Sequence, residues 1–226
     1  MPGPVQKFFR HPASPYVTPF AAFLLLTALA GGAASRELHA LAFGLYALKT
    51  AVAAGLLLFY RKRYDELRWS FSFPAVAVGL LVCLVWVVPE DILRPTMLGS
   101  DRAFDPYRWG HGTAAAFVLS IRWGGSSIVV PIMEELFWRS FLIRYIARPE
   151  DFRSVPVGTL TWPSFVVTTV LFGIEHDRWI VGLVAGASYN ALLYWKKNLS
   201  ACVLAHAITN FALGSYIVAT GKYEFW

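Results

Sequence analysis

The chain has 226 residues, of which 57% are hydrophobic and only 15% are charged. Soluble domains usually carry about 25% charged residues, and several apolar runs here approach the ~20 residues that a bilayer-spanning helix needs. The composition therefore excludes an ordinary soluble domain and predicts an all-α, polytopic transmembrane helix bundle. The formal net charge of +6 does not indicate nucleic-acid binding, because the basic residues lie in short clusters between the apolar runs.

The apolar runs predict seven or eight helices. In chain order they cover about 17–34, 39–60, 73–89, 113–130, 131–147, 164–176, 179–195 and 199–219. The number depends on 113–147, where Gly124, Gly125 and Pro131 favour a break, since proline fits the first turn of a new helix. A polar segment at 89–112 separates the third and fourth runs and is expected to be an extramembrane loop or flap.

Four basic clusters orient the predicted bundle. They are Lys7 with Arg10, Arg61, Lys62 and Arg63 with Arg68, Arg144 with Arg148 and Arg153, and Lys196 with Lys197. Under the positive-inside rule, seven crossings would place all four clusters and the N-terminus in the cytoplasm. A half-membrane segment at 113–130 reconciles seven crossings with eight apolar runs. The first run also fits a cleavable signal peptide, although a first membrane helix fits equally well.

Several features favour packing or anchoring roles. Cys83 and Cys202 lie inside apolar runs, which predicts buried free thiols rather than a disulfide. Small residues four apart in "GLVAG", 182–186, predict close helix packing. Tyr189 and Asn190 are expected to pack rather than to line a cavity. Four tryptophans are expected to be membrane-interface anchors: Trp69, Trp86, Trp109 and Trp123.

Two adjacent carboxylates and an arginine interrupt the apolar stretch "VVPIMEELFWRSFLIRY", 129–145. Charges inside a membrane helix are costly and mark functional sites. Glu135 and Arg139 are four residues apart and can pair on one helix face, whereas Glu134 points ~100° away. One carboxylate is therefore expected to be structural and the other to be available for chemistry.

Two further polar pairs lie in apolar helices, Phe172 with His176 and His206 with Asn210. At 1.5 Å per residue from the nearest polar ends, Glu134 and His176 lie roughly 20 Å deep and His206 roughly 13 Å deep. These side chains can therefore meet inside the membrane. A glutamate and a histidine suit activation of a water, and a second histidine with an asparagine suits an oxyanion. The combination indicates amide hydrolysis without a protein nucleophile, with a Cys202–His206 dyad as the alternative.

These motifs resemble the CAAX prenyl endopeptidase and bacteriocin-immunity family of intramembrane proteases. The resemblance covers about 113–219, and "GLVAGASYNALLYWKKNLSACVLAHAITN", 182–210, resembles its last two core helices. It rests on three motifs in order: Glu134-Glu135-x-x-x-Arg139, Phe172-x-x-x-His176 and His206-x-x-x-Asn210. It divides the chain into membrane helices and a polar loop at 1–112, a catalytic core at 113–219 and a tail at 220–226.

The resemblance also implies a mechanism and a location. Glu134 would be the water-activating base, with His176 assisting, and His206 and Asn210 would stabilise the oxyanion. The substrate would be a membrane-associated peptide or protein, and the chain would lie in a bacterial inner membrane. The region "WVVPEDILRP" suggests the subgroup linked to exosortase sorting systems.

Three questions stay open at this point. The Glu135–Arg139 pair would hold the geometry of the site whether or not the protein is an enzyme. The alternative function is a non-catalytic binding or immunity protein that uses the same cavity. A proton-coupled transporter is disfavoured, because no inverted repeat appears. No cofactor is favoured; zinc bound by Glu134, His176 and His206 is the alternative.

Overall fold

The computed structural model describes residues 3–93, 105–109 and 111–226, and these contain helices and no strand. The predicted all-α fold is confirmed. The helices are α1 Pro4–Arg10, α2 Ser14–Ala34, α3 His39–Tyr60, α4 Phe73–Leu93, α5 Thr113–Gly124, α6 Val130–Glu135, α7 Ile143–Ala147, α8 Trp162–Ile174, α9 Trp179–Lys196 and α10 Leu199–Thr220. The loop predicted at 89–112 lies mostly outside the described residues, and its first part, to Leu93, continues α4.

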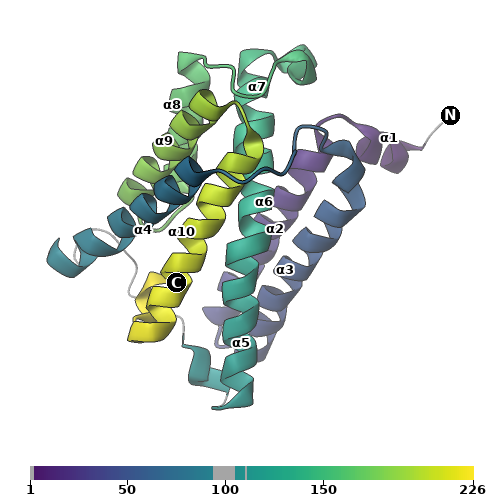
Figure 1. Ribbon diagram of the computed structural model, residues 1–226. Helices are drawn as coiled ribbons and strands as arrows, with labels where there is room; N and C mark the ends of the chain where they lie inside the picture. The colour runs from purple at the N-terminus through teal and green to yellow at the C-terminus, as the bar shows by residue number, and fades with distance from the viewer. Residues whose placement is uncertain (1–2, 94–104, 110) are drawn as a thin grey trace.

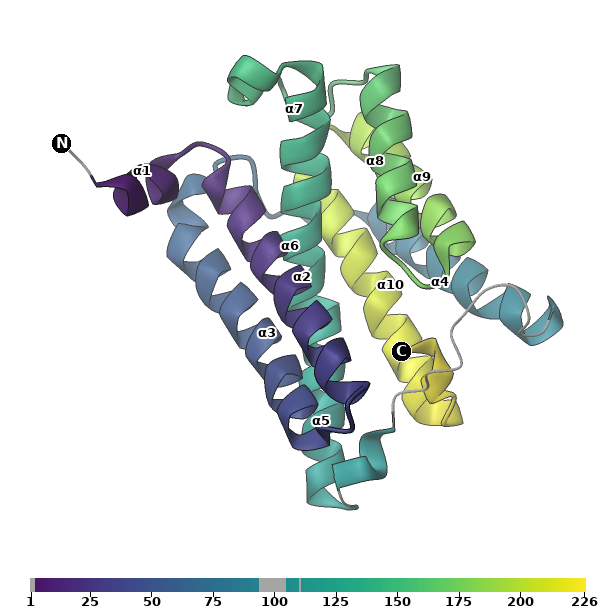
Figure 2. The ribbon, with the colours of Figure 1, turned by 180° about the vertical axis from the view of Figure 1, so that it is seen from behind.

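The bundle is built around a column formed by α5, α6 and α7 (Figure 1). Helices α2 and α3 pack on one side of this column, and α10 runs beside it. The other side carries α4, which packs along α10, and the pair α8 and α9 (Figure 2). Residues from α6, α8, α9 and α10 can therefore meet in the interior.

The column is one continuous helix of 35 residues, Thr113–Ala147. The predicted break and the predicted half-membrane segment at 113–130 are both wrong. The helix absorbs its irregularities as two π-helical segments, Gly125–Val129 and Leu136–Leu142, which widen the turn without ending the helix. Gly125 has a packing role, because a Cβ there would lie 2.8 Å from the Thr50 side chain.

Four helices are long and apolar enough to cross a membrane: Ser14–Ala34, Ala40–Arg63, Thr113–Ala147 and Leu199–Thr220. The prediction of seven crossings counted α8 and α9 as two of them. Instead, both helices run from one end of the bundle only to about its middle, where the chain turns between them (Figures 1 and 2). This hairpin brings the end of α8 to the centre of the bundle, far from either end.

Aromatic packing joins α2 to the column. Phe20 stacks on Phe137 with ring centroids 4.0 Å apart, and Tyr16 stacks on Phe141 at 5.9 Å. Both α2 residues are buried in the main hydrophobic core. The first two turns of α2 thus pack into the main hydrophobic core.

The four basic clusters lie at one end of the bundle. Arg63 donates to the carbonyls of Phe9 and Arg10 in α1, which ties the first cluster to the second. Residues of the other three clusters line one pocket at the same end, which includes Arg68, Arg153 and Lys196. This placement agrees with the prediction that all four basic clusters lie on one side of the membrane. The α8–α9 hairpin preserves it, because the hairpin returns the chain to the basic end without crossing the bundle.

Candidate active site

A cavity of about 190 Å³ lies between α4, α6, α8, α9 and α10. The four residues predicted to be catalytic all line it: Glu134 from α6, His176 from the turn after α8, and His206 and Asn210 from α10. Three separate segments of the chain therefore deliver the predicted side chains to one place. The shared cavity makes the predicted chemistry geometrically feasible, while the role of each residue stays a prediction.

Glu135 is held by two partners in a fully buried network. Its Oε1 accepts from Arg139 Nη1 at 3.1 Å and lies 2.9 Å from His206 Nδ1. Arg139 also donates to Asn190 Oδ1 at 3.2 Å and to the Gly186 carbonyl at 3.3 Å, and its guanidinium lies 4.3 Å from the Phe172 ring centroid. The carboxylate and guanidinium thus lock α6, α9 and α10 together.

Glu134 differs from Glu135 in lining the cavity, although Oε2 of each glutamate lacks a hydrogen-bond partner among the described residues. Its side chain is buried, and its Oε2 makes no hydrogen bond to any described residue. A buried carboxylate oxygen without a partner costs free energy, so a water or a bound ligand is expected to supply the missing hydrogen bond. Because Glu134 lines the cavity, that partner can reach it there.

Each histidine uses one ring nitrogen and keeps the other available. His206 Nδ1 lies 2.9 Å from Glu135 Oε1, which also accepts from Arg139, so we infer that Nδ1 carries the hydrogen and donates it. His176 Nδ1 lies 2.7 Å from the Phe172 carbonyl, which only accepts, so it donates as well. Both rings are therefore fixed with Nε2 as the nitrogen that remains for the cavity.

Asn210 is oriented by the column helix. In the π segment, the Val130 N–H donates to the Gly125 carbonyl five residues back. In this register the Ser126 carbonyl would pair with residue 131, which is proline and has no N–H. Asn210 Nδ2 donates to that carbonyl at 2.7 Å instead. Pro131, predicted to start a new helix, therefore leaves a carbonyl that positions the asparagine.

Two aromatic side chains that line the cavity were expected to have other roles. Trp86, expected to be an interface anchor, lines the cavity with its ring 5.5 Å from that of His176, so this expectation is wrong. Tyr189, expected only to pack, also lines the cavity and stacks on His206 at 5.1 Å. The tryptophan precedes the polar segment by only three residues, so sequence position alone favoured the interface.

Asn190 is a network residue that the sequence did not single out for function. It is fully buried, accepts from Arg139 and donates to Thr168 at 2.9 Å and to Thr169 at 3.0 Å. Asn190 lies four residues after Gly186, whose carbonyl also accepts from Arg139. This spacing places Asn190 and Gly186 on one helix face, and it is the sequence signal that could have identified Asn190.

Other predictions on packing are confirmed. Cys83 and Cys202 are buried free thiols. The Cys202 thiol contacts the Tyr189 carbonyl, and His206 Nδ1 is taken by Glu135, so the alternative dyad does not form through that nitrogen. A Cβ on Gly182 would lie 2.9 Å from the Gly173 carbonyl, which shows the close α8–α9 packing expected of 182–186. The Trp109 side chain lies outside the described residues.

The alternative zinc site does not fit the residues as they are placed. Among the described residues, no three His, Cys, Asp or Glu side chains are grouped closely enough to hold a metal ion. No step of the chemistry below is therefore derived through a metal.

The fold and the cavity define a class of protein: a helical membrane bundle with a buried carboxylate and two histidines at its centre. Residues 113–212, just under half of the chain, match the family described as "Type II CAAX prenyl endopeptidase Rce1-like". The matched segment contains every predicted catalytic residue. The resemblance to this family of membrane endopeptidases is thereby confirmed, and the chain is an integral membrane protein. Neither a curated protein nor a solved structure matches the chain.

Proposed function

We propose that the protein is an intramembrane endopeptidase, in which Glu134 activates a water to hydrolyse a peptide bond of a membrane-associated peptide or protein. The observation that carries this proposal is the contrast between two adjacent glutamates. Through Oε1, Glu135 binds Arg139 and His206, and it does not line the cavity, although its Oε2 also lacks a partner among the described residues. Glu134 lines the cavity, and its Oε2 has no partner among the described residues. A purely structural cluster would have no need of the second carboxylate.

The chemistry follows from the groups that line the cavity. Glu134 takes a proton from a water held with the help of His176, and the resulting hydroxide attacks the carbonyl carbon. The oxyanion then accepts a hydrogen bond from the second Nδ2 hydrogen of Asn210, and we assign His206, whose ring lines the same cavity, to help stabilise it. Glu134 returns the proton to the leaving nitrogen as the C–N bond breaks, which yields a carboxylic acid and an amine.

The location of the basic end supports a topology. Cytoplasmic ends of membrane proteins are enriched in lysine and arginine, so we place the end with the four basic clusters, and the N-terminus, in the cytoplasm. The inner membrane of a bacterium is the proposed location. The link to exosortase systems rests on the segment "WVVPEDILRP", part of which lies outside the described residues.

The test is Glu134→Gln, which keeps the size of the side chain and removes the base. Membranes that contain the wild-type or the variant protein are compared by mass spectrometry of new peptide termini, and the cleaved peptide is then used with detergent-purified protein. We expect the rate to fall by at least ~10²-fold. Glu150→Gln is the matched control, because Glu150 is an exposed carboxylate outside the cavity, and its rate should not change.

The two outcomes separate an enzyme from a binding protein. Wild-type cleavage by Glu134→Gln would refute the catalytic assignment. Stable capture of a peptide by both proteins, with no new terminus in either membrane, would show that the cavity binds a partner without hydrolysing it.

A further inference from the structure

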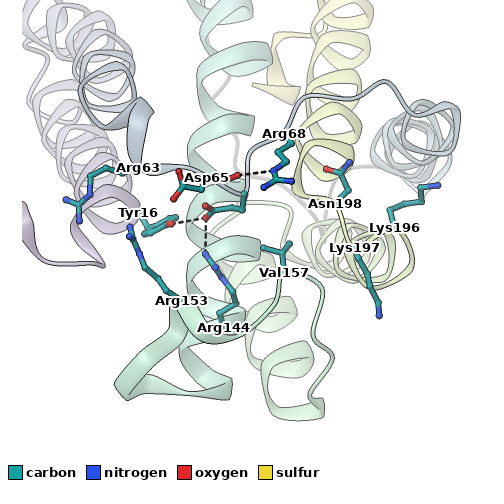
Figure 3. A pocket seen from close by; sticks show the side chains of 11 residues that line it. Tyr16, Arg63, Asp65, Arg68, Arg144, Arg153, Val157, Lys196, Lys197 and Asn198 are labelled. Atoms are coloured by element: carbon teal, nitrogen blue, oxygen red, sulfur yellow. Dashed lines mark hydrogen bonds and ion pairs between the residues drawn. The ribbon is translucent and has the colours of Figure 1, made fainter.

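A second, larger pocket of about 610 Å³ opens at the basic end of the bundle (Figure 3). Its lining comes from four places that are distant in the sequence: the start of α2, the segment 61–70 after α3, the α7 region with residues 149–157, and the end of α9. It shares no residue with the cavity that contains Glu134. The pocket is therefore a separate feature of the fold.

The floor of this pocket is an organised polar network. Glu66 accepts from Arg144 Nη2 at 2.9 Å and from the Tyr16 hydroxyl at 2.8 Å (Figure 3), and Ser140 also donates to it. Arg144 and Tyr16 are buried. These contacts hold the segment after α3 against α2 and the column, so the shape of the pocket is fixed by buried side chains.

The segment after α3 is anchored further by Tyr64. Its buried hydroxyl donates to the Pro15 carbonyl at 2.7 Å. Burial raises the pKa of Tyr64, so the hydroxyl stays a donor at any physiological pH. The wall of the pocket is thus not a freely moving loop.

The rim carries more positive charge than the pocket needs for its own structure. Six cations line it, Arg63, Arg68, Arg144, Arg153, Lys196 and Lys197, against two acids, Asp65 and Glu66, which leaves a net charge of 6 − 2 = +4. Glu66 pairs with the buried Arg144. Four of the six cations, Arg68, Arg153, Lys196 and Lys197, are exposed and make no ion pair with a described residue. The positive-inside rule explains cations at this end but does not require them to converge on one cavity.

The surroundings place the pocket at the level of lipid headgroups. Trp69, Trp162 and Trp195 are largely exposed at the same end of the bundle, and exposed tryptophans mark the membrane–water interface. The segment 61–69 also lines an apolar groove of about 400 Å³, through Leu67 and Trp69. A basic pocket and an apolar groove along one segment are what an amphiphile with an anionic head and an acyl chain requires.

We propose that this basic pocket binds the phosphate-bearing headgroup of an anionic phospholipid from the adjacent leaflet. Arginine and lysine form charge-assisted hydrogen bonds with phosphate oxygens, and basic pockets at the cytoplasmic side of membrane helices bind such headgroups. The site is independent of the proposed hydrolysis. A bound headgroup would join the segment after α3, the end of the column and the end of α9.

The experiment compares two double variants of the full chain. Arg153→Gln/Lys197→Gln removes two unpaired cations from the rim. Lys62→Gln/Arg10→Gln removes two exposed cations from the same end that do not line the pocket. Binding is measured by native mass spectrometry and by thermal unfolding in micelles to which phosphatidylglycerol or phosphatidylcholine is added.

We expect wild-type protein and the Lys62 variant to retain phosphatidylglycerol. We expect the Arg153 variant to bind it about 100-fold more weakly, since each hydrogen bond to a charged group contributes about ten-fold or more. Equal weakening in both variants would show a diffuse charge effect and overturn the proposal. Equal stabilisation by phosphatidylcholine would overturn it too. Inorganic phosphate tested alone is the last arm: a shift equal to that of the lipid would overturn the lipid assignment.

Discussion

Replacing Arg139 with methionine tests whether the buried network stabilises the bundle. Methionine keeps most of the volume and removes the charge. Arg139 is 1% exposed and makes hydrogen bonds to Glu135, Asn190 and the Gly186 carbonyl. The variant leaves Glu135, which is fully buried, with only His206 as a partner, and it leaves Asn190 Oδ1 without a donor.

Two costs add in this variant. Stranding a buried ion costs about 3–5 kcal/mol, and an unpaired buried amide oxygen costs about 1–3 kcal/mol. Because neighbouring costs are not fully additive, we expect the free energy of unfolding to fall by about 4 kcal/mol or more. For a chain of this size, each kcal/mol lowers the melting temperature by about 2–4 °C, which predicts a decrease of about 8–16 °C. The measurement is thermal unfolding in detergent, followed by tryptophan fluorescence.

Two companion proteins show whether the loss comes from the stranded charge. Arg148→Met is the control, because Arg148 is exposed and its side chain donates to the Ser154 hydroxyl. It should change the free energy of unfolding by less than ~0.5 kcal/mol. The double variant Glu135→Gln/Arg139→Met removes both charges and keeps an acceptor for His206. It should be more stable than Arg139→Met by about 1–2 kcal/mol. No recovery, or an Arg139→Met protein as stable as wild type, would refute the reasoning.

Three further results are expected. Asn190→Leu should lower the free energy of unfolding by about 2–3 kcal/mol, since it orphans buried hydrogen-bonding groups, and a wild-type melting curve would contradict this. Gly182→Ala should destabilise the protein, because its Cβ meets the Gly173 backbone at 2.9 Å, whereas Gly55→Ala, with nothing within 4 Å, should be neutral or stabilising by up to ~1 kcal/mol; equal melting temperatures would refute the packing argument. Purified protein should hold no stoichiometric metal and should resist chelators; one zinc lost and restored together with activity would overturn the proposed metal-free step.

Much of the bundle could be predicted from hydropathy alone. A bilayer demands long apolar runs, so the runs at 17–34, 39–60 and 199–219 anticipated α2, α3 and α10 to within three residues at each end. The candidate site could be predicted for a related reason. Charged groups are so costly in this environment that Glu134 and His206 stood out against their neighbours.

The hairpin of α8 and α9 was beyond such reasoning, since hydropathy gives the length of an apolar run and not the depth at which the chain turns. The turn depends on contacts between helices, such as the approach of Gly182 to the Gly173 backbone. The hydrogen bond between Asn190 and Arg139 was also unpredictable, because it too depends on contacts between helices. This bond joins residues 51 apart in the sequence, and no local pattern encodes that distance.

Pro131 shows how a correct local rule led to a wrong helix and still pointed to the site. Proline has no backbone N–H wherever it occurs, and for this reason Pro131 was predicted to begin a new helix. In this bundle the loss is met from outside the helix, because Asn210 in α10 donates to the Ser126 carbonyl, which has no donor at residue 131 in the π register. The column can therefore continue through the membrane, and α10 gains a fixed asparagine one turn after His206. The same missing hydrogen bond that suggested a break joins two helices at the cavity, so the irregularity belongs to the architecture of the proposed site.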